Sequence, residues 1–128
     1  MERSRIIMDI LKSIKERIVG KVPLLSKRSS HWETVRKHWL EHNNECAACG
    51  VKNDLQVHHV KPFHLDPSLE LNFTNFITLC EKKGGFECHL HVGHHGNFKS
   101  ENPNVREEAA VNRKGHGLAD LVIVIPEE

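Results

Sequence analysis

The feature that most constrains this chain is the crowding of metal-binding side chains between Cys46 and His95. All four cysteines and seven of the eleven histidines lie in these fifty residues. An ordinary core is stabilised more simply by leucines, because cysteine and histidine carry polar atoms that need partners once they are buried. The stretch therefore predicts a site that is organised by metal.

The four cysteines suit one structural zinc ion. Cys46 and Cys49 are separated by two residues, the spacing at which one tight turn presents two sulfurs to a tetrahedral ion. Cys80 and Cys88 supply the other two ligands, and a Gly-Gly turn between them absorbs the longer separation. Aromatic residues make up only 5% of the chain, so metal binding would supplement a thin apolar core. Free core cysteines are the alternative.

Cysteine usage also bears on the compartment. No apolar run approaches the length of a membrane span, and the charged N-terminus has no stretch of signal-peptide type. We therefore expect the protein to lie in a reducing cytoplasm, where four cysteines bind zinc rather than form disulfides.

The net charge of +1 hides an asymmetry along the chain. Residues 1–40 carry ten Lys and Arg against four Asp and Glu, whereas residues 41–128 carry eight against thirteen. The basic N-terminal third is suited to tracking DNA phosphates, and a solvated helix face is the alternative reading.

Two helices are expected before the cysteines. Apolar residues recur at spacings of three and four over residues 4–19, which predicts an amphipathic helix. A second helix is expected over residues 31–42, with Ser30 and Glu33 at the spacing of a capping box. Its two tryptophans share an apolar face and should belong to the core.

The middle and end of the chain predict strands and short helices. Residues 55–60 alternate as a strand does, and the apolar run 76–79 should pair back on it across an irregular loop. Residues 88–98 should be helical with glycine interruptions, and residues 105–112 a helical turn or two. Residues 118–125 suit a buried strand or an ordered arm.

The adjacent pair His58-His59 divides its chemistry between two faces. Successive side chains of a strand point to opposite sides, so the two rings do not easily bind one ion. One can bind metal while the other handles a proton, which is what metal-assisted hydrolysis requires. Two structural histidines are the alternative.

Several of these segments together resemble the HNH endonucleases, a family with a ββα-metal site. The resemblance is carried by His58-His59-Val60-Lys61-Pro62, Asn75-Phe76-Ile77-Thr78-Leu79-Cys80, Cys88-His89 and Gly93-His94. It implies that His58 is a metal ligand, that His59 is the general base, and that Asn75 holds the hairpin and the base in place. His89 and His94 would complete the metal site.

The choice of helix histidines rests on the resemblance and not on spacing. His91 and His95 are four residues apart and would share one face of a regular helix, whereas His89 and His94 are five apart. We favour His89 and His94, because His89 follows a zinc cysteine as in the family and a π-bulge near Gly93 would bring such residues together.

The resemblance implies an α+β fold: a small ββα-metal core with a four-cysteine zinc knuckle, flanked by N-terminal helices. Residues 30–104 would form the nuclease domain, between a basic helix and linker (1–29) and a C-terminal extension (105–128). The cofactors would be structural Zn²⁺ and one catalytic divalent metal, Mg²⁺, Mn²⁺, Ni²⁺ or Zn²⁺.

The implied function is hydrolysis of phosphodiester bonds in DNA. In its small size the chain resembles stand-alone phage proteins of this family that act with the terminase in genome packaging. Such a role would place the chain in the host cytoplasm. The alternatives are a zinc-stabilised DNA-binding module and a terminase-associated accessory protein without nuclease activity of its own.

Overall fold

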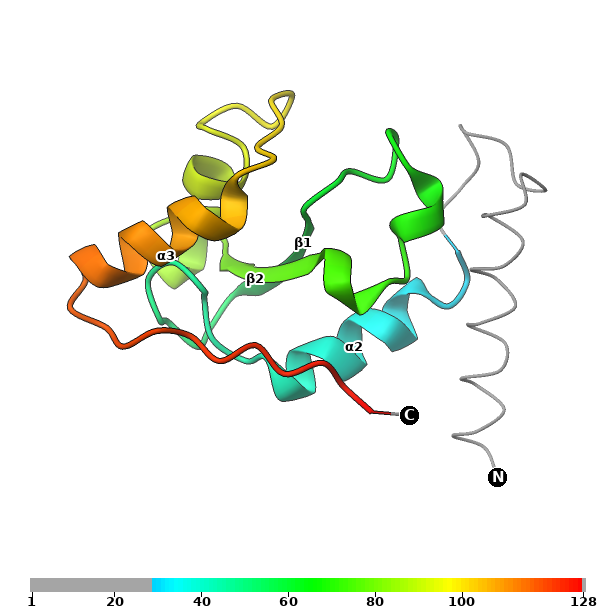
Figure 1. Ribbon diagram of the computed structural model, residues 1–128, viewed down its shortest axis with the longest axis horizontal. Coiled ribbons are helices and arrows are strands. Elements are labelled where there is room, and N and C mark those ends of the chain that lie inside the picture. The colour runs from blue at the N-terminus through cyan, green and yellow to red at the C-terminus, as the bar shows by residue number, and fades with distance from the viewer. Residues whose placement is uncertain (1–28, 128) are drawn as a thin grey trace.

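The computed structural model describes residues 29–127, and a two-stranded hairpin lies at its centre (Figure 1). The helix expected over residues 4–19 and the basic linker that follows it lie outside the described residues. Between residues 29 and 127, no helix is both long and apolar enough to cross a membrane.

The hairpin forms where alternation and apolar character predict it. β1 (Leu55–His59) pairs antiparallel with β2 (Phe76–Cys80), and His58 lies opposite Ile77. Every residue of β2 is buried, because one face of the hairpin packs on a helix and the other on a cysteine-rich core. The hairpin is therefore the common wall of two small cores.

The long connection between the strands is mostly irregular, as predicted. Two short 3-10 turns interrupt it, η1 (Pro67–Leu69) and η2 (Phe73–Asn75). Each follows an Asp or Asn whose side chain accepts a hydrogen bond from the backbone nitrogen two residues on, at 3.1 and 3.0 Å. Such side chains compete well with helix and sheet, so the connection turns without forming either.

α2 (Trp32–His42) covers one face of the hairpin. Val35 and Trp39 are buried against it, and Trp39 Nε1 donates a hydrogen bond of 2.9 Å to Thr78 Oγ1 on β2. The indole nitrogen is thereby satisfied inside the core. The prediction that the tryptophans belong to the core is confirmed for Trp39, and Trp32 packs half-buried beside it.

The predicted capping box at the start of α2 is wrong. The N-cap is His31, one residue after Ser30, so Glu33 stands too early in the helix to reach back to a cap. Ser29 takes over part of this role, because its hydroxyl accepts a hydrogen bond of 3.1 Å from the His31 backbone nitrogen.

The opposite face of the hairpin carries the cysteine-rich core. The π-helical turn η4 (His89–Gly93) and α3 (Val105–Gly115) pack there. α3 has 11 residues, more than the one or two turns predicted. Its first turn contains Glu107 and Glu108 and its last turn contains Arg113 and Lys114, charges that favour a longer helix through its dipole.

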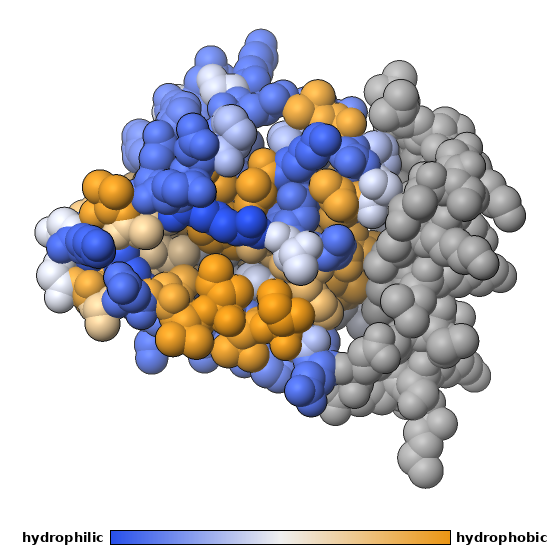
Figure 2. Space-filling model, viewed as in Figure 1, coloured by the Kyte–Doolittle hydropathy of each residue, from blue (hydrophilic) through white to orange (hydrophobic). Residues whose placement is uncertain are grey.

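The C-terminal residues 118–127 run from the end of α3 to α2, and only the last part of the segment lies along α2 (Figure 1). Both side-chain atoms of the Asn43 amide bind the backbone of Val124, at 2.7 and 2.9 Å. Val122–Ile125 are exposed and contribute to the apolar surface in Figure 2. A buried strand is therefore the wrong prediction and an ordered arm the right one. The backbone carbonyl of Thr78 in β2 already accepts a hydrogen bond of 2.9 Å from the backbone nitrogen of Ala47, so the arm does not extend the sheet there.

Candidate metal centres

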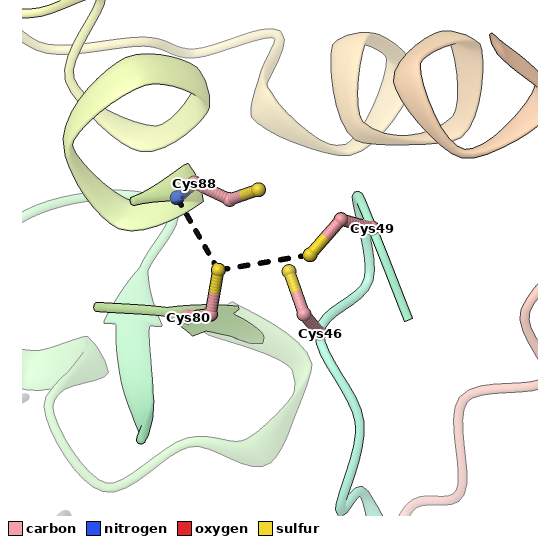
Figure 3. Close-up of side chains that lie close together, drawn as sticks. All are labelled: Cys46, Cys49, Cys80 and Cys88. Atoms are coloured by element: carbon pink, nitrogen blue, oxygen red, sulfur yellow. Dashed lines mark hydrogen bonds between the residues drawn. The ribbon is translucent and has the colours of Figure 1, made fainter. Parts of the chain in front are cut away.

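The four cysteines converge from three parts of the chain. Cys46 and Cys49 lie on one loop, Cys80 ends β2, and Cys88 immediately precedes η4. All four are buried, and their sulfurs lie within 4.8 Å of one another (Figure 3). Gly50 closes the loop with φ +80°, a conformation that glycine adopts without strain, and its nitrogen donates to the Cys46 carbonyl at 2.9 Å. The predicted convergence of the four thiols is confirmed.

The pKa values of Cys46, Cys49 and Cys88 indicate that a bound cation would stabilise the cluster. The hydrogen bond from Cys88 lowers the pKa of Cys46 to about 5, and burial raises the pKa of Cys49 to about 12. The bond to Cys46 raises the pKa of Cys88 far above its usual range. Four buried sulfurs at this separation cannot all lose their protons unless a cation balances them. Their donor type, number and closeness fit a tetrahedral zinc ion.

A second cluster is built from histidines. His58 comes from β1, His89 begins η4, and His94 is the residue that follows its last residue. The three rings each offer a nitrogen within 4.8 Å of the others, and the Nε2 atoms of His89 and His94 are 3.3 Å apart. On a regular α-helix residues five apart would diverge by about 140°. The π-helical turn removes that divergence, so it is the element that makes the cluster.

Hydrogen bonds outside the cluster fix how two of the rings face it. His89 Nδ1 bonds to the Glu81 carboxylate, and His94 Nδ1 bonds to the Ser100 carbonyl at 2.9 Å. Both partners can only accept, so both Nδ1 atoms carry hydrogen in these bonds. In the neutral rings the Nε2 lone pairs then point at each other, an arrangement that a cation between them would stabilise.

His58 has a buried nitrogen that a cation would satisfy. It is buried, and its Nε2 has no hydrogen-bond partner within residues 29–127. Burial, followed by the nearby His89 and His94, lowers the pKa of His58 to about 3, and burial also lowers the pKa of His89. Neutral imidazoles with inward lone pairs are the form in which histidine binds divalent metals. The three residues fit such an ion.

His59 faces the other side of β1, as the alternation of a strand requires. Its ring packs against Trp32 and Phe76, with centroids 4.7 and 5.1 Å away. Its Nε2 lies 2.9 Å from the backbone carbonyl of Glu70. Because a carbonyl only accepts, Nε2 carries the hydrogen, and Nδ1 carries the lone pair in the neutral ring. Of the two ring nitrogens, Nδ1 is therefore the one with a lone pair that could take up a proton.

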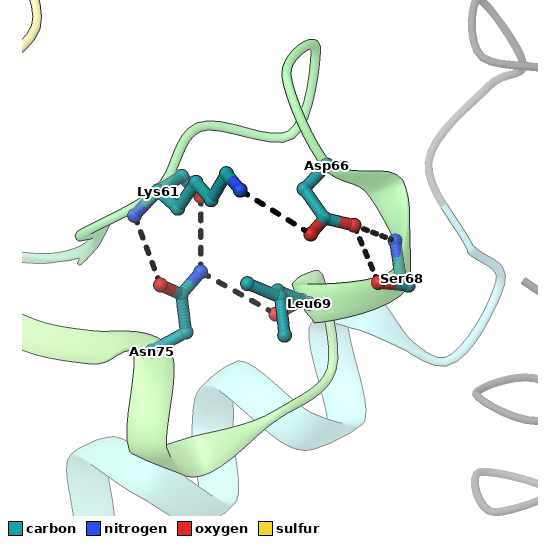
Figure 4. A network of polar contacts seen from close by, with 5 residues as sticks. All are labelled: Lys61, Asp66, Ser68, Leu69 and Asn75. Carbon is teal, nitrogen blue, oxygen red and sulfur yellow. Dashed lines mark hydrogen bonds and ion pairs between the residues drawn. The ribbon is translucent and has the colours of Figure 1, made fainter. Parts of the chain in front are cut away.

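Asn75 ties together the long connection between the strands (Figure 4). Its Oδ1 accepts from the Lys61 nitrogen at 2.9 Å, and its Nδ2 donates to the Lys61 carbonyl at 3.0 Å. Nδ2 also lies 3.5 Å from the Leu69 carbonyl. Lys61 lies two residues after His59. Leu69 is next to Glu70, whose carbonyl contacts the His59 ring. Asn75 therefore fixes the backbone that follows His59 and the backbone beside Glu70, whose carbonyl contacts the His59 ring.

Comparison with known protein families identifies the segment that holds both clusters. Residues 45–95 match the family described as HNH endonuclease. These residues belong to the HNH endonuclease family. The match takes in all four cysteines and every histidine of the cluster, and it supports a nuclease-type, DNA-binding function for the HNH domain. Neither the curated proteins nor the solved structures gave a match to the chain.

Within the HNH domain the structure separates the two candidate histidine pairs. It brings His89 and His94 to His58 and leaves His91 and His95 outside. The His91 side chain is exposed, and His95 Nε2 bonds to Glu108 at 2.8 Å. His91 therefore faces solvent, and His95 faces α3.

Sequence reasoning missed three groups around the HNH domain's histidines. They are the carboxylate of Glu81 and the backbone carbonyls of Glu70 and Ser100. A carbonyl leaves no signal in the sequence, because every residue carries one. Glu81 offered only its place beside Cys80, which does not by itself point to His89.

Proposed function

We propose that the chain is a metal-dependent endonuclease that hydrolyses phosphodiester bonds in DNA. The observation that carries the proposal is the division between two neighbouring residues: His58 joins His89 and His94, while the His59 ring lies on the other face of β1 against the Glu70 carbonyl. Adjacent Cα atoms are about 3.8 Å apart, so both side chains start from the same end of β1. One phosphate bound at that end would lie close to the metal ligand and to the base.

The residues would divide the reaction between them. His58, His89 and His94 would hold one divalent ion, which when bound supplies stabilisation of negative charge on the scissile phosphate and the departing 3′ oxygen. His59 would take a proton from the attacking water through Nδ1. The water oxygen would bond to phosphorus as the bond to the 3′ oxygen breaks, which leaves a 5′-phosphate. The departing 3′ oxygen would take a proton from solvent and become a 3′-hydroxyl. One ion and one base cut one strand, so a nick is the elementary event.

The cysteines would hold a structural Zn²⁺ that stabilises the fold. Their buried, crowded thiols support this assignment, and a reducing cytoplasm would keep them available. The catalytic ion would be Mg²⁺, Mn²⁺, Ni²⁺ or Zn²⁺, and supercoiled plasmid digested with each in turn ranks them.

Substitution of the two neighbouring histidines tests the proposal. His59→Ala should keep metal affinity and reduce nicking of supercoiled plasmid by about 10²–10⁴, the usual contribution of a positioned base. His58→Ala should lose the catalytic metal in a calorimetric titration. His91→Ala is the matched control, because His91 lies on the same turn with an exposed ring outside the cluster, and it should cut like wild type.

Two results would contradict the proposal. If His58→Ala and His59→Ala cut like wild type, the pair is structural. If wild-type protein binds DNA but nicks it with none of the four metals, the chain is a zinc-stabilised DNA-binding module.

A role in phage genome packaging is a further part of the proposal, and it rests only on the resemblance to phage proteins of the HNH family. Copurification with a terminase subunit tests it. Plasmid nicking by the isolated chain separates a free-standing nuclease from an accessory protein.

A further inference from the structure

Glu81 occupies a position between the two metal centres. It follows Cys80 at the end of β2, and its carboxylate Oε1 lies 2.5 Å from His89 Nδ1. Its backbone nitrogen donates to the Asp54 carbonyl at 2.8 Å, beside the start of β1. The residue is thus fixed at the backbone by the hairpin and at the side chain by a histidine of the cluster.

The bond determines which nitrogen of His89 faces the cluster. A carboxylate only accepts, so His89 Nδ1 donates, and Nε2 is left with its lone pair 3.3 Å from His94 Nε2. The negative charge behind the ring also makes Nε2 a stronger donor to a cation. His94 has a neutral carbonyl in the same place, so Glu81 is the one charged residue seen to orient a ring of this cluster within residues 29–127.

Both members of the pair stand next to a cysteine of the other centre. Glu81 adjoins Cys80 and His89 adjoins Cys88, and the Cys88 backbone nitrogen donates to the Cys80 sulfur at 3.5 Å. The cysteine cluster therefore sets the separation of the two backbones that carry the carboxylate and the ring. An error in that separation would be passed to the histidines through Glu81.

We propose that Glu81 is a positioning residue that orients His89 for metal binding and transmits the order of the cysteine cluster to the histidine cluster. The inference rests on the proposed function, because it requires that His58, His89 and His94 bind a divalent ion. Its action is on the affinity of that ion and not on the fold alone.

Titration of Ni²⁺ into the zinc-loaded full chain, followed by calorimetry, tests the inference. Glu81→Ala should weaken Ni²⁺ binding at the histidines by about 10- to 100-fold, the usual effect of losing such an outer partner. Glu81→Gln keeps an oxygen that accepts from Nδ1 but loses the charge. Its Ni²⁺ affinity should therefore lie between that of wild type and that of Glu81→Ala. Zinc content should stay equal to that of wild type in both variants.

Glu87→Gln is the matched control. Glu87 lies two residues before His89 in the same connection, and its side chain makes no hydrogen bond or ion pair within residues 29–127. It removes the same charge without touching the ring, so Ni²⁺ affinity should be that of wild type.

The possible failures are distinguishable. If Glu81→Ala and Glu81→Gln bind Ni²⁺ within threefold of wild type while His58→Ala loses it, Glu81 is only a structural ion pair and the inference is overturned. If Glu81→Ala does not fold, the same threshold applied to Glu81→Gln decides. If wild-type protein binds no Ni²⁺ at the histidines, the proposed function fails with it.

Discussion

Gly93→Ala is the sharpest test of how tightly the histidine cluster is packed. Gly93 ends η4 and is buried. A Cβ there would lie 3.1 Å from Leu79 Cδ1 and 3.2 Å from both Cε1 and Nδ1 of His58. Carbon atoms prefer about 3.5–4.0 Å, so both neighbours would have to move by several tenths of an ångström. Neither side chain can move out into solvent, because Leu79 is fully buried and His58 is 4% exposed.

The size of the effect follows from this crowding. One extra methyl group in a filled core costs about 1–3 kcal/mol. For a chain of this length that corresponds to a fall in melting temperature of about 4–12 °C. Because His58 is one of the two neighbours, the same variant should also bind divalent metal more weakly at the histidines.

Thermal unfolding and metal calorimetry on one preparation measure both effects. Gly115→Ala is the control, since an added Cβ there has no atom within 4 Å and alanine favours a helix by up to about 1 kcal/mol. That variant should melt at or above the wild-type temperature. A Gly93→Ala protein that melts as wild type and binds metal equally well would show that space exists beside His58, and would refute tight packing at this position.

Two further predictions concern metal and pH. Cys46→Ser should lose tightly bound zinc and melt well below wild type, because binding free energy at such a site is folding free energy; equal melting with and without zinc would refute this. Stability without added divalent metal should fall as pH drops from about 6.5 to about 3. The unfolded His58 ring takes up a proton from about pH 6.5 and the folded ring only near pH 3, so acid favours unfolding by up to about 5 kcal/mol across that window. Urea unfolding at several pH values measures it, and a flat profile from pH 7 to 4 would contradict the burial of His58.

The sequence by itself determined the elements whose signal is local. The period of two over residues 55–60 placed His58 and His59 on opposite faces of β1, because the pleat of a strand alternates side chains whatever surrounds it. The start of α2 shows the limit of such signals. A shift of one residue in the N-cap was enough to undo the capping box, since capping depends on local hydrogen bonds that sequence spacing alone does not fix.

The chemistry of the cysteines was also readable in advance. Four thiols in a chain with few aromatic residues predict a shared ion from composition and spacing alone, and β2 and the loop after α2 do bring them together. The length of the Cys80 to Cys88 connection was no obstacle, because η3 (Lys82–Gly84) and the glycine at position 85 with φ +116° turn the chain back.

The pair of helix histidines that meets His58 was predicted only through the family resemblance, and the partners that orient the rings were decided by tertiary structure alone. Regular helical spacing favours His91 and His95, whereas the π-helical turn selects His89 and His94. Glu81 reaches His89 across eight positions, and the Glu70 carbonyl reaches His59 across eleven. Such partners are set by how the hairpin, its long connection and η4 pack together. The backbone periods of a strand or helix relate only residues a few positions apart, so they carry no information about these contacts.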